Sequence, residues 1–289
     1  MKKAGYILFF LCLLCGAESR AQKKAAAGNP KSGLYQAIMN LDFPAARGYL
    51  SSIDLVNTEA GIVGETQFLW WYAISEGESL HPLLLLIDSL TTLLPTPEDP
   101  LLSTHFSMVK MRLFALESNY IKAWKAWTAV EKNLPALLQQ KNDSLIYLIE
   151  GMCRCIKGEL QQKIPLLMRD SVTHSVNTAK GIHLLRLCTT NQNPVIRGEA
   201  NYYLMRYYAD ITINPLEALT YSTYLITTYP QNYIFRYYHI QILLAIDQRP
   251  EALKMAIEGK QLIRKSNLNP EQKAYGIKLI TRACSLSGG

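Results

Sequence analysis

The chain has 289 residues, 49% of them hydrophobic, and its 30 lysines and arginines outnumber its 23 aspartates and glutamates. This hydrophobic content excludes an intrinsically disordered protein and is sufficient for a sizeable core. The basic residues are scattered in runs no longer than two, so they do not indicate a nucleic-acid-binding surface.

The N-terminus has the features of a secretory signal peptide. Lys2 and Lys3 precede an apolar run over residues 6–14. This run is shorter than the roughly 20 residues that a membrane-spanning helix requires. Small residues at Ser19 and Ala21 predict cleavage after Ala21. We therefore expect export, with no transmembrane span after cleavage.

A lipid anchor at Cys15 is the less favoured interpretation of the same region. Leu14 is large, whereas lipoprotein signals place a small residue directly before the cysteine. We expect a signal peptide over residues 1–21, a flexible polar leader over 22–32, and a periplasmic or cell-surface location.

Beyond the leader, apolar residues recur with helical spacing, and neither strand alternation nor hairpin signals occur. The spacing predicts helical pairs over 33–95 and a helical repeat region over 101–289. The Pro-rich segment PTPEDP at 95–100 predicts a bend between them. The predicted helices cover 32–40, 44–53, 63–76, 81–94, 101–117, 120–140, 143–157, two shorter helices within 159–190, and then 194–211, 215–228, 233–247, 250–265 and 270–286.

Two details of this pattern concern helix ends. Asp42 is placed to cap the helix that begins near Pro44, and Gly158 is placed to end the helix over 143–157. Because the predicted loops are short, neighbouring helices should run antiparallel.

Four cysteines remain after signal cleavage: Cys153, Cys155, Cys188 and Cys284. Export permits disulfides, and four cysteines could pair in three ways, which the sequence does not distinguish. Cys153 and Cys155 would point to different sides of a helix and lack the Cys-x-x-Cys spacing of metal or redox sites. Buried thiols are the favoured interpretation.

A 34-residue repeat is visible in the C-terminal half. Glu-Ala-Leu occurs at 217–219 and again at 251–253, each time shortly after a proline. A proline follows Ala218 by 12 residues at Pro230, and Pro135 follows Ala123 at the same spacing. A 34-residue period is typical of helix–turn–helix repeats.

These marks make residues 104–137, 199–232 and 233–266 resemble tetratricopeptide (TPR) repeats, and in particular those of bacterial exported TPR proteins. The resemblance implies an all-α fold, an α-solenoid of antiparallel helix pairs. The units depart from the family at the small residue usual in the first helix, where Met111, Arg206 and Ile240 stand. Residues 33–95 and 143–190 match the pattern poorly.

In TPR proteins the first helix of each pair lines a concave groove. The resemblance implies groove positions at Tyr203, Tyr207, Asp210, Tyr237, Tyr238 and Gln241, with His105, Met108 and Arg112 in the upstream unit. Ten of the chain's 17 tyrosines lie between Tyr202 and Tyr238. Tyrosine offers a rigid contact surface with a polar tip, which suits a peptide or glycan groove. The alternative, that these tyrosines pack between helices, is open and is expected for Tyr202, Tyr221 and Tyr224.

No catalytic motif accompanies this architecture. The five histidines have no metal-ligand spacing, and neither a nucleophile elbow nor a phosphate-binding loop occurs. We therefore expect a non-enzymatic protein-interaction or scaffold module of the cell envelope, without cofactor or metal, that binds an extended segment in its groove. The alternative is a glycan-binding helper of a surface uptake system, and a helical hydrolase or lyase is less favoured.

Overall fold

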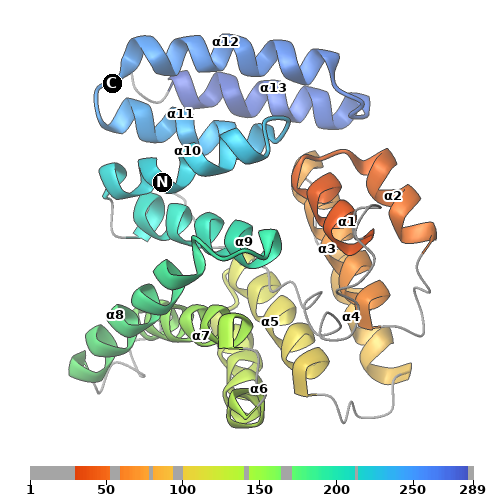
Figure 1. The fold of residues 1–289 in the computed structure, drawn as a ribbon, viewed down its shortest axis with the longest axis vertical. Helices are drawn as coiled ribbons and strands as arrows, with labels where there is room; N and C mark the ends of the chain where they lie inside the picture. The colour runs from red at the N-terminus through yellow and green to blue at the C-terminus, as the bar shows by residue number, and fades with distance from the viewer. Residues whose placement is uncertain are drawn as a thin grey trace. The chain divides into compact units, whose positions relative to one another are not determined.

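The computed structural model describes residues 30–52, 59–77, 81–93, 100–139, 143–163, 171–211 and 214–285 (Figure 1). Throughout these ranges the chain forms helices and the turns between them, and none of it forms a strand. The prediction of an all-α protein is therefore confirmed. The predicted signal peptide, Cys15 and nearly all of the predicted bend at 95–100 lie outside the described residues.

The helices alternate with short connections. In chain order they are α1 (Pro30–Met39), α2 (Phe43–Ser51), α3 (Glu59–Glu76), α4 (His81–Leu93), α5 (Pro100–Leu116), α6 (Tyr120–Leu138), α7 (Asp143–Lys163), α8 (Ser171–Cys188), α9 (Pro194–Arg206), a π-helical turn η3 (Tyr207–Ile211), α10 (Pro215–Thr228), α11 (Tyr233–Ala245), α12 (Arg249–Lys265) and α13 (Pro270–Ser285).

Side-chain caps explain why many of these boundaries agree with the sequence prediction. Asp42 accepts a hydrogen bond from Ala45 N at 3.3 Å at the start of α2, as predicted. Asn214 does the same for Glu217 N ahead of α10. Asn269 and Gln272 form a reciprocal capping box at α13, with N–H···O distances of 2.8 and 3.2 Å. Asx residues beside prolines therefore fix the helix starts.

Two boundary predictions are wrong. α7 continues through Gly158 to Lys163, and α8 is one helix where two shorter ones were expected within 159–190. A glycine inside a helix costs only about 1 kcal/mol, and burial of Leu160 beyond it offsets that cost. Pro135 lies inside α6, as it does in the predicted helix over 120–140, and the final turn of α6 buries Leu137.

The described chain divides into two compact units, here called unit 1 and unit 2. Unit 2 comprises residues 81–204, in which α5 pairs with α6 and α7 pairs with α8. α7 and α8 approach closely at Gly151 and Gly181. A Cβ at Gly181 would lie 2.7 Å from the carbonyl oxygen of Gly151. Only glycine therefore permits this crossing.

The cysteines of unit 2 are buried thiols, as expected. Cys153, Cys155 and Cys188 are at most 1% exposed and form no disulfide. Burial raises the pKa of Cys188 to about 12, and it also raises the pKa of the other two thiols. A thiol with such a pKa stays protonated and unreactive at neutral pH. Cys284 lies near the end of α13 and is partly exposed.

In unit 1 the C-terminal helices α10 to α13 pack as consecutive neighbours joined by loops of three or four residues (Figure 1). Helices joined by loops this short run antiparallel. Ala218 and Ala252, the small residues of the repeated Glu-Ala-Leu, are fully buried where these helices approach each other. α11 also packs against α13.

The N-terminal helices α1 to α3 belong to the same unit and join its C-terminal helices through long-range contacts. Asn232 donates to Met39 O at 2.7 Å, and Gln272 donates to Ser75 Oγ at 3.0 Å. The rings of Trp71 and Phe235 meet edge to face at 5.5 Å. In a simple solenoid each repeat contacts only its neighbours in sequence. Unit 1, by contrast, is assembled from both ends of the chain.

None of the helices in the described ranges combines the length and apolar character needed to cross a membrane.

Candidate partner-binding face

The upstream residues of the predicted groove are buried. His105, Met108 and Arg112 lie on α5 and are 0%, 1% and 2% exposed. α5 carries apolar residues on all sides, which is typical of a helix enclosed by others rather than of one lining an open groove. The sequence prediction that these three residues line a groove is therefore wrong.

Tyr203 is also a core residue. It lies on α9, is fully buried, and donates its hydroxyl proton to Glu159 Oε1 of α7 at 3.0 Å. Burial is the main cause that raises its pKa. Tyr203 therefore packs between helices and does not line a groove. Tyr202 and Tyr221, which are 1% and 7% exposed, are buried in the same way.

The other five residues predicted to line the groove are partly exposed and lie on η3 and α11. Two further residues with exposed surface, Tyr275 and Arg282, lie on the neighbouring helix α13. We call this set the tyrosine face; its members are Tyr207, Asp210, Tyr237, Tyr238, Gln241, Tyr275 and Arg282.

A buried arginine organises one side of the tyrosine face. Arg206 Nε lies 2.6 Å from Asp210 Oδ2, and the Arg206 side chain is only 5% exposed. The Arg206 guanidinium also lies over the Tyr238 ring, 4.4 Å from its centroid. The ion pair and the ring together fix η3 against α11.

The π-helical turn contributes to this arrangement. The sequence predicted one helix over 194–211, but α9 ends at Arg206 and five residues of π-helix follow. A π-helical turn inserts an extra residue into the helical repeat, so the side chains beyond it face a new direction. Arg206 is the last residue of α9, and Asp210 lies within the π-helical turn.

Tyr237 stands at the centre of the face. Burial raises its pKa, Arg282 and Arg206 lower it, Asp210 raises it, and a hydrogen bond from Gln241 lowers it. Its ring meets that of Tyr238 edge to face at 5.1 Å. Tyr237 is therefore close to charged groups from both η3 and α13, and its neutral phenol is available as a hydrogen-bond donor at pH 7.

Tyr275 and Arg282 were missed by the sequence reasoning. Burial raises the pKa of Tyr275, and the nearby Tyr237 raises it further. The Tyr275 ring packs against Gly77, where a Cβ would lie 2.3 Å from a ring carbon and where φ is +69°. Tyr275, Lys278 and Arg282 have the i, i+3, i+7 spacing of one helix face, a signal that could have identified them.

Arg282 gives the tyrosine face an uncompensated positive charge. Asp210 neutralises Arg206, whereas no carboxylate of the described residues forms an ion pair with the exposed Arg282. The segment 249–285 around it has eight lysines and arginines but three glutamates. An acidic ligand is therefore favoured electrostatically over a basic one.

Ser222 and His239 form a serine–histidine pair between α10 and α11. Ser222 Oγ lies 2.9 Å from His239 Nδ1, and Ser222 also donates to Leu219 O at 3.0 Å. The serine is fully buried and the histidine is 6% exposed. A nucleophile needs a substrate within reach, and here the pair is enclosed between α10 and α11. It serves to satisfy buried polar groups.

Nowhere in the described ranges do three histidine, cysteine, aspartate or glutamate side chains gather as metal ligands. The chain matches none of the protein-family models, curated proteins or solved structures with which it was compared. The resemblance to TPR proteins therefore rests on the residues themselves.

Proposed function

We propose that the chain is a non-enzymatic interaction or scaffold module of the cell envelope, exported by its signal peptide. In this proposal α9 to α13 are helix pairs of a TPR-like solenoid, and an extended segment of a partner protein binds to the tyrosine face. The first helices of successive pairs would be α9 with η3, then α11, then α13.

The observation that carries the proposal is the set of partly exposed tyrosines on these three successive helices. Tyr207 on η3, Tyr237 and Tyr238 on α11, and Tyr275 on α13 are each partly exposed. Partly buried aromatic side chains held by neighbouring groups lose little entropy on binding and are frequent anchors of protein interfaces.

Charge favours one class of partner segment. Arg282 is exposed, and its charge lowers the pKa of the nearby phenols of Tyr237 and Tyr275. A carboxylate of the partner would pair with Arg282 beside these two phenols, which are hydrogen-bond donors. We therefore expect the bound segment to be acidic and its binding to weaken with added salt.

The test is capture of partners from an envelope fraction by the tagged, full-length protein. Replacing Tyr207→Ala and Tyr237→Ala together should reduce the captured partner about tenfold or more, since each tyrosine supplies contact area. Tyr147→Ala is the matched control, because Tyr147 is 39% exposed on α7, outside the face. Undiminished capture by the double variant, with helical circular dichroism intact, would refute the proposal.

A further inference from the structure

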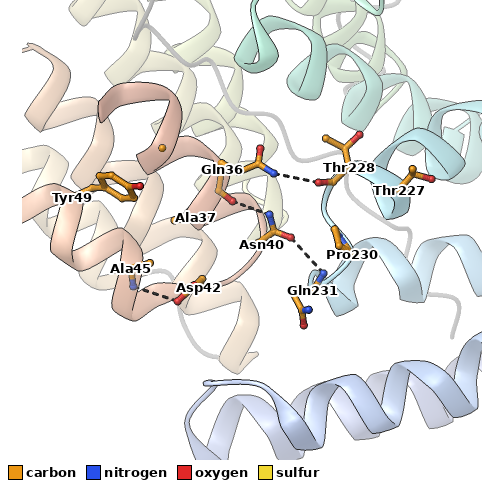
Figure 2. Close-up of a pocket in the computed structure, with 11 residues that line it drawn as sticks. Gln36, Ala37, Asn40, Asp42, Ala45, Tyr49, Thr227, Thr228, Pro230 and Gln231 are labelled. Atoms are coloured by element: carbon orange, nitrogen blue, oxygen red, sulfur yellow. Dashed lines mark hydrogen bonds between the residues drawn. The ribbon is translucent and has the colours of Figure 1, made fainter. Parts of the chain in front are cut away.

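A pocket of about 620 Å³ lies in unit 1 between the α1–α2 hairpin and the turn that joins α10 to α11 (Figure 2). Small-molecule sites typically have volumes of about 300–1,000 Å³. The pocket shares no residue with the tyrosine face. Its polar lining residues are Gln36, Asn40, Asp42, Tyr49, Thr227 and Gln231, together with Thr228.

The lining is rich in hydrogen-bonding groups and poor in charge. Amides and hydroxyls predominate, Asp42 is the single carboxylate, and none of the described lining residues is a lysine, arginine or histidine. Arg47, the cation of α2, lies over the Phe68 ring and pairs with Glu65 at 3.0 Å. An anionic ligand would therefore meet a carboxylate and no counter-charge.

Two amide side chains are held in place across the pocket. Gln36 donates to Thr228 O at 3.2 Å, and Asn40 accepts from Gln231 N at 3.4 Å (Figure 2). The side-chain carbonyl oxygen of Gln36 and the second carboxylate oxygen of Asp42 remain as acceptors, while no described residue forms a hydrogen bond with the Gln231 side-chain amide. Groups held in this way lose little freedom when a ligand binds.

Tyr49 supplies an aromatic surface at one side of the pocket (Figure 2). Its side chain is 38% exposed, and its ring packs against the α1 backbone at Gly33. A Cβ at Gly33 would lie 2.7 Å from Tyr49 Cζ, so the glycine allows the ring to occupy this place. A tyrosine ring of this kind offers an apolar surface with a hydroxyl at its end.

We propose that this pocket binds a neutral polyhydroxylated ligand, a sugar unit. Sugar hydroxyls both donate and accept, which matches a lining that mixes amide donors, amide and carboxylate acceptors and hydroxyls. The C–H face of the sugar would lie on the Tyr49 ring. Its hydroxyls would replace the hydrogen bonds of the waters that they displace.

The experiment screens the full-length protein on a glycan array that holds neutral, sialylated and sulfated glycans. The neutral oligosaccharide with the strongest signal is then titrated in solution by calorimetry, in parallel with its free monosaccharides. This second arm shows whether a single sugar unit or a chain is needed. We expect binding of neutral glycans and none that requires a sialic acid or sulfate group.

Substitutions of the lining residues test whether the glycan binds in this pocket. Tyr49→Ala and Gln231→Leu should each weaken the neutral glycan about tenfold or more, while Tyr147→Ala and Tyr237→Ala should leave its affinity unchanged. Thermal unfolding checks that each variant is folded. If Tyr49→Ala does not fold, Gln231→Leu still tests the pocket, because it changes an exposed turn residue.

The inference is overturned if no neutral glycan binds, if only anionic glycans bind, or if the pocket variants bind as well as the unaltered protein. It does not depend on the tyrosine face, so either proposal can fail alone.

Discussion

His239 is a buried imidazole whose protonation opposes folding. Burial, followed by the nearby Arg236, lowers its pKa from the usual 6.5 to about 4. Between these two values the unfolded chain binds the proton more readily than the folded chain. The free energy of unfolding should therefore fall as pH drops from about 6.5 to about 4.

The His239→Asn variant should lack this part of the acid sensitivity, because an amide does not titrate. Between pH 7 and 4.5 it should lose about 2 to 3 kcal/mol less stability than the unaltered protein. Urea unfolding at the two pH values measures the difference. An equal loss in both proteins would show that His239 is not held neutral by the fold.

The crossing of α7 and α8 depends on two glycines. In Gly181→Ala the new Cβ would lie 2.7 Å from both Gly151 O and Cys155 Sγ, so the helices must separate. We expect a loss of about 1 to 3 kcal/mol. Gly48→Ala in α2 is the matched control, because its Cβ has no neighbour within 4 Å, and alanine there should stabilise the helix by up to about 1 kcal/mol. Thermal unfolding that moves in the same direction for both variants would contradict this explanation.

At the scale of helices, Asn232 both caps α11 and links it to the end of α1. Its side chain accepts from Ile234 N at 3.0 Å and Phe235 N at 3.2 Å and also donates to Met39 O. Asn232→Ala should cost about 1 to 3 kcal/mol, because two amides and a buried carbonyl lose their partner. Asn119→Ala, which removes one bond of 3.3 Å at the start of α6, should cost about 1 kcal/mol or less. Equal costs in chemical unfolding would argue against the linking role of Asn232.

The sequence predicts helices well where local chemistry decides them. The starts of α2, α10 and α13 follow from an Asx cap beside a proline, and these signals lie within a few residues of the boundary. Gly158 misled the prediction because tertiary burial of the residues beyond it outweighs the local preference. The π-helical turn after Arg206 has no comparable local signal, since its stabilising partners include Tyr238 on another helix.

At the scale of the whole molecule, the docking of the N-terminal helices onto α11 and α13 could not be predicted. The pairs that form it, such as Trp71 with Phe235 and Ser75 with Gln272, are far apart in sequence and follow no repeat. The same limit applies to the predicted groove. Helical spacing places Tyr203 and Tyr237 on successive first helices, but only packing decides that Tyr203 is buried and Tyr237 partly exposed.

Because α3 packs against α11 and α13, a destabilising substitution in α3 should also destabilise these C-terminal helices. Trp71 is 1% exposed, and Trp71→Ala should cost about 3 to 5 kcal/mol by leaving a cavity against Phe235. Hydrogen exchange should then accelerate in α11 and α13 as well as in α3. Trp127→Ala, which empties a buried site on α6 of unit 2, serves as the control and should accelerate exchange there first. Unchanged protection of α11 in the Trp71 variant would contradict the assembly of unit 1 from both chain ends.

The central claim, that the tyrosine face binds a partner protein, is tested most directly by site-specific photo-crosslinking in cells. A benzophenone amino acid replaces Tyr207 or Gln241 on the face, and Tyr147 on α7 as the exposed control. The proposal predicts that both face positions crosslink to the same partner protein and that Arg282→Gln diminishes this adduct, while position 147 gives none. Adducts of equal yield at all three positions, or an adduct at position 147 alone, would contradict it.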